Sequence, residues 1–360
     1  MSGAAEAATG AARAAVVRLP SPRPRVLWLA AATVFLLVAA VLGVFVGPVD
    51  IGVGATLRAS IAHLPFVHVH STLSPTEDAI VFQLRLPRVV LGILVGAMLA
   101  GCGAAFQGAF RNPLADPYLL GTAAGAGLGA TLVVAYAPAD TRDVLVPVAA
   151  FVGAVVAVGV AYGIGRSAGG RGAVSLVLAG VVVASFFTAL QTFVQQQNVD
   201  TVQEVYSWIL GRLSTAGWHE VLVILPYAAV SAVVLVLYGR LLDVLAVGDE
   251  EAASLGIDVR RVRLAVIVAA TVGTAAAVAV SGLIGFVGII VPHTIRLLVG
   301  GSYRAVLPLS LIAGAGFLVL ADVIARTVLS PAELPIGVVT AFFGAPFFAL
   351  VLRRSRVTAT

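Results

Sequence analysis

The sequence contains no lysine, because all 22 of its Lys and Arg positions are arginine. A nucleotide-binding loop of the form G-x-x-x-x-G-K-[ST] needs a lysine that reaches the β- and γ-phosphates. Such a loop is therefore excluded. If ATP drives this protein, another chain must hydrolyse it.

Charged side chains are also scarce, at 11% of the chain, which is less than half the roughly 25% of an ordinary soluble domain. Hydrophobic residues make up 60% of the 360 residues, and the mean hydropathy is +1.06. At about 20 residues per spanning helix, this composition suffices for about ten membrane crossings. It excludes a water-soluble enzyme or a nucleic-acid-binding protein, despite the basic pI of 9.9.

The chain has a single cysteine, Cys102, which excludes an intrachain disulfide and a cysteine-based zinc or iron–sulfur cluster. Cys102 lies in an apolar run, and we interpret it as a small packing residue. His63, His68 and His70 lie close together in a predicted polar connection, residues 48–84. They are either solvated loop residues or a contact to a metal or haem, and the sequence does not separate the two.

The sequence predicts an all-α membrane protein whose two ends are cytoplasmic. The first apolar segment is too long for the core of a signal peptide, so we interpret it as an uncleaved span. Residues 1–25 and 355–360 form the predicted cytoplasmic tails, and 26–354 the transmembrane domain. The ten predicted spans are about 28–47, 87–108, 117–137, 144–165, 173–195, 218–239, 262–281, 283–299, 305–325 and 335–352.

The distribution of arginine tests this topology. Cytoplasmic loops of membrane proteins carry an excess of basic residues. With the N-terminus inside, 16 of the 22 arginines fall on the inner side. The six on the outer side are Arg58, Arg85, Arg88, Arg142, Arg212 and Arg326.

Glycine recurs in the second and third segments, where it predicts close approach of neighbouring helices in lipid. The stretch 125–130 also matches the G-x-G-x-x-[GA] dinucleotide pattern. It lacks the preceding strand and the following acid that the pattern requires, so we reject that interpretation.

Pro292 predicts a break of the helix near 285–292. A role of the adjacent His293 as a proton relay is the alternative. A proton-coupled carrier would normally have acids inside its spans, but the acids of this chain cluster near the ends of the spans.

The longest predicted cytoplasmic connection between spans is 240–263. Asp249 and the two glutamates after it favour the start of a short helix, and Gly256 favours its end. Asp258 can then cap a second helix, with Arg260, Arg261 and Arg263 at the membrane surface. A short capped helix of this kind fits a groove of a partner protein, and a solvated surface loop is the alternative.

Arginine on the outer side runs against the topology bias. Arg85 and Arg88 stand at the outer mouth of the second span, and either a docked acidic partner or an intrachain or headgroup contact explains them. Arg326 follows Asp322 by four residues, which places both on one helical face. Pairing with Asp322 therefore explains Arg326, and it does not forbid docking.

Several passages together resemble the family of type II ABC importer permeases often called FecCD-like. The matching passages are RLPRVVLGILVGAMLAG (85–101), FQGAFRNPLADPYLLGTAAGAGLGA (106–130), LVLAGV (176–181), VYSWILGRLSTAGW (205–218), GDEEAASLGIDVRRVR (248–263), VSGLIGFVGIIVPHTIRLLVG (280–300) and ADVIARTVLSPAELPIGVVTAFFGAPFFALVL (321–352).

The resemblance implies a ten-span subunit in a bacterial cytoplasmic membrane that pairs with a second copy or a paralogue, two cytoplasmic ATPase subunits and an outer substrate-binding protein. It implies a translocation subunit rather than an enzyme, with no cofactor of its own and ATP on the ATPase. Arg85, Arg88 and Arg326 match the outer arginines that dock the binding protein. The predicted coupling residues are Gly248, Asp249, Glu250, Glu251, Ala252, Ala253, Leu255 and Gly256.

By the same resemblance, the spans that begin near Leu176 and Ile336 line the pathway. The expected cargo is a ferric siderophore, with haem or cobalamin as alternatives. A secondary carrier or channel that works without ATP is the alternative of another class.

Overall fold

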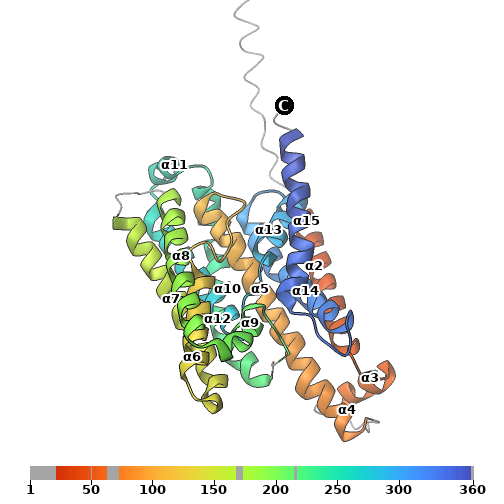
Figure 1. The fold of residues 1–360 in the computed structure, drawn as a ribbon. Helices are drawn as coiled ribbons and strands as arrows, with labels where there is room; N and C mark the ends of the chain where they lie inside the picture. The colour runs from red at the N-terminus through yellow and green to blue at the C-terminus, as the bar shows by residue number, and fades with distance from the viewer. Residues whose placement is uncertain (1–21, 50, 63–72, 168–172, 215–216, 358–360) are drawn as a thin grey trace, which may run out of the picture.

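The computed structural model describes residues 22–49, 51–62, 73–167, 173–214 and 217–357, and within these ranges every regular element is a helix. Figure 1 shows the helices running between two ends of the molecule, with α11 and the end of α15 at one and α3 and α4 at the other. The main helices are α2 (Pro22–Phe45), α5 (Leu86–Phe110), α6 (Thr122–Tyr136), α7 (Arg142–Ser167), α8 (Ala173–Gln197), α10 (Trp218–Leu245), α12 (Val259–Ser281), α13 (Val287–Val299), α14 (Tyr303–Thr327) and α15 (Ile336–Val357).

Each predicted apolar segment overlaps one of these helices. Seven candidate spans are long enough to cross a membrane, and α6, α13 and α15 contain shorter apolar stretches. The all-α membrane fold is therefore confirmed, while ten complete crossings remain a prediction. Helix α2 begins at Pro22, within the predicted tail 1–25, and α15 continues to Val357.

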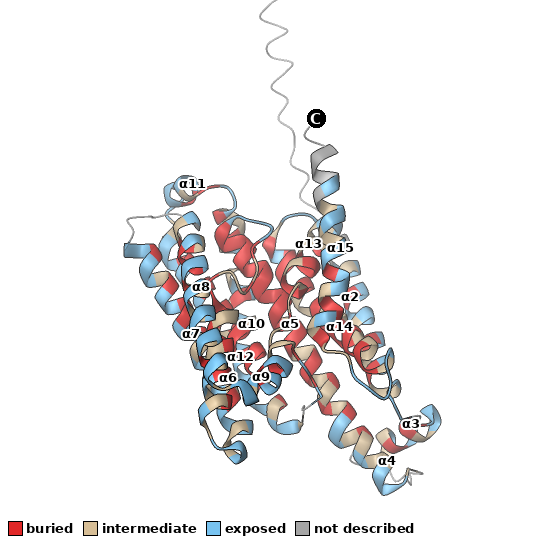
Figure 2. Ribbon diagram, in the orientation of Figure 1, coloured by how far each residue is buried: buried red, intermediate tan, exposed pale blue. Residues whose placement is uncertain are grey.

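Helix α5 forms the centre of the core. It packs against α10, α12, α13 and α14, and its middle is buried on all sides (Figure 2). A helix surrounded by protein in this way is apolar around its whole circumference. Cys102 lies in this core with no exposed surface, as expected of a packing residue.

Glycines bring helix backbones into contact, as predicted. An added Cβ at Gly103 in α5 would collide with the carbonyl of Gly288 in α13. The same holds for Gly96 against α14 and for Gly125 in α6 against Gly153 in α7. The rejected dinucleotide pattern lies inside α6, where its glycines serve this packing.

The predicted helix break is present but lies earlier than Pro292. Helix α12 ends at Ser281, residues 282–286 are not helical, and Pro292 lies inside α13. Tyr118 explains how the break is tolerated, since its hydroxyl donates to the carbonyl of Ile284 at 3.0 Å and accepts from the Ile284 N–H at 3.1 Å. Those backbone groups would otherwise lack partners in the membrane.

The predicted polar connection 48–84 contains helices. These are α3 (Val53–Ala62), α4 (Pro75–Ala79) and a π-helix (Ile80–Arg85) that runs directly into α5. Ser74 and Glu77 form a capping box that starts α4. His63, His68 and His70 lie outside the described residues. The ring of His293 lies edge-on to that of Phe347, with the two ring centroids 6.0 Å apart.

Candidate functional site

The predicted helix in the 240–263 connection is present as α11 (Asp249–Ser254). Gly248 is its N-cap residue, and Gly256 adopts a φ of +80°, which an L side chain rarely does. The carboxylate of Asp258 accepts from the N–H of Arg261 at 3.0 Å and caps α12. The start, stop and cap read from the sequence are therefore all confirmed.

Helix α11 presents an exposed surface at one end of the molecule (Figure 1). Gly248 and Ala252 are buried and Asp249 is half-buried, whereas Glu250, Glu251, Ala253, Leu255 and Gly256 are exposed. Val247 and Leu255 are each 70% exposed. Acidic and large apolar side chains next to each other suit a protein partner better than water alone.

A buried arginine fastens α11 to the core. The guanidinium of Arg263 donates to both carboxylate oxygens of Asp249 at 2.8 and 3.0 Å and to the carbonyl of Ala109 in α5 at 3.0 Å. Arg111 adds a contact to Asp249 at 3.5 Å. The sequence placed Arg263 at the membrane surface with its neighbours. Arg263 is buried within the protein, at 7% exposed, whereas Arg260 and Arg261 are exposed. The position of these arginines relative to the membrane remains a prediction.

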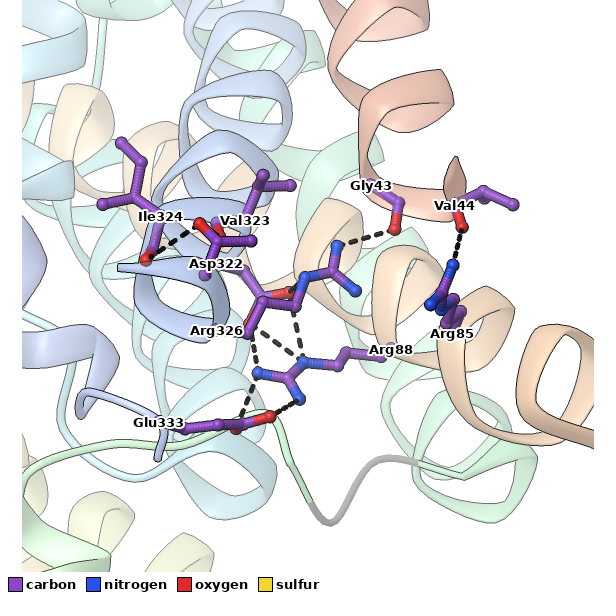
Figure 3. A network of polar contacts seen from close by, with 10 residues as sticks. Gly43, Val44, Arg85, Arg88, Asp322, Val323, Ile324, Arg326 and Glu333 are labelled. Atoms are coloured by element: carbon purple, nitrogen blue, oxygen red, sulfur yellow. Dashed lines mark hydrogen bonds and ion pairs between the residues drawn. The ribbon is translucent and has the colours of Figure 1, made fainter. Parts of the chain in front are cut away.

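At the opposite end, the structure brings the three predicted docking arginines together (Figure 3). Arg88 lies between two acids: its Nη2 is 2.8 Å from Asp322, and its Nη1 is 2.8 Å from Glu333. The Asp322 side chain is 2% exposed and that of Glu333 33%. Arg88 thus has one buried partner and one that a solute can reach.

The other two arginines close off the end of α2. Arg85 donates to the carbonyls of Val44 and Phe45 at 3.2 Å, and Arg326 donates to that of Gly43 at 2.6 Å (Figure 3). Cations stabilise the carbonyl end of a helix through its dipole. The final turn of α2 is therefore held by side chains from α14 and from the π-helix before α5.

These contacts bear on the docking prediction. Arg326 pairs with Asp322 at 3.5 Å, which is the partner that their spacing indicated. The pairing of Arg88 with Asp322 and Glu333 was not predicted, because 234 and 245 residues separate them. All three arginines have partners within the chain, and docking remains a prediction.

Helix α8 carries an uncharged polar stripe that the sequence analysis did not single out. Its exposed residues Ser185, Thr188, Thr192 and Gln196 recur at helical spacing on one face. The apolar residues Leu176, Ala179, Val183 and Val194 are buried on the opposite face. The hydroxyls of Ser185 and Thr192 donate to carbonyls of α8 itself at 2.9 Å. Thr188 and Gln196 are therefore the members of the stripe that best fit a wet cavity or another protein. Spacing together with the run of Thr and Gln could have revealed it.

Similarity to known proteins identifies the family of this chain. Residues 35–354 match the model of the FecCD transport family. The chain is 42% identical to the cobalamin import system permease protein BtuC of Halobacterium salinarum, over 79% of this chain and 76% of that one. It is 35% identical to the Fe(3+)-citrate import system permease protein YfmD of Bacillus subtilis, over 89% and 94% of the two chains.

A solved structure has the same fold. It is an inward-facing conformation of a metal-chelate type ABC transporter, with a TM-score of 0.77 and 29% identity, covering 91% of this chain and 98% of that one. With the family match over most of its length, this chain belongs to the FecCD transport family and is a multi-pass membrane permease of an ABC importer.

Proposed function

We propose that this permease imports a ferric siderophore across the cytoplasmic membrane, powered by ATP hydrolysis on a separate subunit. The observation that carries the translocation step is the polar stripe on α8. Facing a second permease subunit, it would line a path with hydroxyl and amide groups and no charge. Such a surface lets a large polar chelate pass without binding it tightly.

Helix α11 is the proposed contact to the ATPase. Its exposed acids and the apolar side chains of Val247 and Leu255 would enter a groove on that partner. Asp249, at the first position of the helix, is bonded to Arg263. A displacement of α11 would therefore pull directly on α12 and, through the Ala109 carbonyl, on α5.

The iron cargo is supported by the relative whose name specifies Fe(3+)-citrate, which aligns over 89% of this chain. Cobalamin is the second candidate, favoured by the relative named for it at 42% identity. Both cargoes are large polar complexes, and the neutral α8 stripe accommodates either.

The test is uptake in a strain that lacks this permease and its counterparts. Labelled iron on several siderophores, labelled haem and labelled cobalamin are supplied in parallel, with and without a plasmid that restores the permease. We expect restoration of iron uptake from at least one siderophore. Restoration of cobalamin or haem uptake alone would refute the siderophore assignment.

A further inference from the structure

Arg212 has no role in the docking prediction or in the proposed function. It belongs to the segment between α9 (Val202–Ile209) and α10, and its side chain lines two cavities. One cavity, of about 160 Å³, is shared with Arg88 and Glu333. The other, of about 270 Å³, is shared with Arg142 and Glu204. Arg212 thus connects the arginine network of Figure 3 to the outer ends of α6 and α7.

The other arginines of these cavities have partners. Arg88 is bound by two acids, and Arg142 pairs with Glu204 at 2.6 Å. Arg212 is exposed, and among the described residues its guanidinium has neither an ion pair nor a side-chain hydrogen bond. Acids line both cavities, but among the described residues none pairs with Arg212, so its guanidinium is available to an acid from outside.

The acids in the second cavity are positioned for other contacts. The carboxylate of Glu220 accepts from the N–H of Gly217 at 2.8 Å, at the start of α10. Asp143 lies in the first turn of α7, where the helix dipole stabilises a negative charge.

The backbone beneath Arg212 is held in place. Its N–H donates to the carbonyl of Ser281, at the end of α12, at 2.8 Å. The neighbouring Gly211 accepts from the N–H of Ile336, at the start of α15, at 3.2 Å. A charged group on such a fixed segment loses less freedom on binding than one on a loose loop.

The size of the cavities selects the class of ligand. Sites for small molecules usually enclose roughly 300–1,000 Å³, and both cavities beside Arg212 are smaller, at about 160 and 270 Å³. A whole metal chelate does not fit, whereas one inserted side chain does. Arginine binds a carboxylate through two parallel hydrogen bonds.

We infer that Arg212 binds a carboxylate side chain of the substrate-binding protein that docks on the outer face. The inference rests on the proposed function, since it needs an importer with such a partner. It assigns this contact to Arg212, which lies beside arginines that are already paired within the chain.

The experiment measures binding of the importer's own substrate-binding protein to the permease–ATPase complex in lipid nanodiscs. We expect Arg212→Glu to weaken binding by about tenfold or more, because an attraction becomes a repulsion. Arg58→Glu is the matched control, since Arg58 is also exposed and lies on the same side in α3. This control should bind within about twofold of the unchanged protein.

A second variant protects the test against a folding defect. Arg212→Gln adds no charge, and we expect weaker binding with a shallower dependence on NaCl, because one ion pair is lost. Unchanged affinity and salt dependence in this variant would overturn the inference and leave the proposed function intact. If the unchanged complex fails to bind the substrate-binding protein, the inference and the proposed docking fall together.

Discussion

Asp322 joins two arginines at the end of the molecule opposite α11. Its carboxylate is nearly inaccessible and contacts two arginines, Arg88 and Arg326. Removal of one partner from a buried ion pair leaves a charge without compensation, and this costs several kcal/mol. Glu333 contacts Arg88 from the solvent side, where an ion pair contributes little.

We therefore predict that Asp322→Asn lowers the free energy of unfolding by about 3 kcal/mol. Glu333→Gln should lower it by less than about 1 kcal/mol. Thermal unfolding of the purified permease in detergent measures both. Equal melting temperatures for the two variants would show that Asp322 is not the dominant partner.

Glycine at position 103 is required by the contact of α5 with α13. We predict that Gly103→Ala destabilises the protein by about 1–3 kcal/mol, because the new methyl group would meet the Gly288 carbonyl. In an open helix the same change would stabilise by up to about 1 kcal/mol.

Gly92→Ala is the control for this change. Its added Cβ would meet Leu213 and Val319 at an ordinary 3.4 Å. Melting temperatures that fall equally for both variants would contradict the close approach at Gly103.

At the scale of elements, α11 and its attachment are the clearest case. The limits of α11 followed from the acids Asp249, Glu250 and Glu251 and from Gly256, because helix starts and stops depend on local backbone chemistry. The hydrogen bonds of Arg263 did not follow from local signals, because they join α11 to the end of α5, where Ala109 is 154 residues from Arg263 in the sequence. Local signals thus located the predicted coupling helix, and the fold determined what holds it.

We predict that Arg263→Ala uncouples the importer. The ATPase should still bind and hydrolyse ATP, but transport per ATP should fall severalfold, because α11 would move without α5 and α12. Reconstituted vesicles report both rates. Arg260→Ala, at an exposed position of the same helix, is the control and should leave the ratio unchanged. An unchanged ratio of transport to ATP hydrolysis in Arg263→Ala would exclude a role of the Arg263 hydrogen bonds in coupling.

The helix break between α12 and α13 shows a limit of reading from sequence. Proline predicted a break, but the chain leaves helical geometry at Gly282, with a φ of +69°, and re-enters after Phe286. Tyr118, from a different part of the chain, binds the freed backbone of Ile284. The existence of the break was predictable, and its position depended on a distant partner.

The polar stripe on α8 leads to a prediction about the transport path. Thr188→Val and Thr192→Val together remove two hydroxyls with little change of shape. We expect slower uptake with an unchanged melting temperature, because both residues are exposed and outside the core. Val182→Ile, at another exposed position of α8, is the control. Equal uptake in all three proteins would argue against a path along this face.

At the scale of the whole molecule, composition and charge predicted most of the architecture. The apolar segments and the arginine bias gave an all-α membrane protein, and the helices follow those segments. The predicted contact with the ATPase is at the α11 end of the molecule, and the cluster of arginines is at the other end (Figures 1 and 3). With no lysine for a P-loop, ATP hydrolysis that powers transport would take place on another subunit.

The most direct test of this account is uptake by vesicles that contain the purified permease, its ATPase and the substrate-binding protein. Labelled ferric siderophore is offered on the side of the binding protein, and ATP on the side of the ATPase. We predict uptake that requires ATP and stops when the catalytic glutamate of the ATPase is replaced by glutamine. Uptake that continues with the inactive ATPase, or without any ATPase, would contradict the account and indicate a carrier or channel.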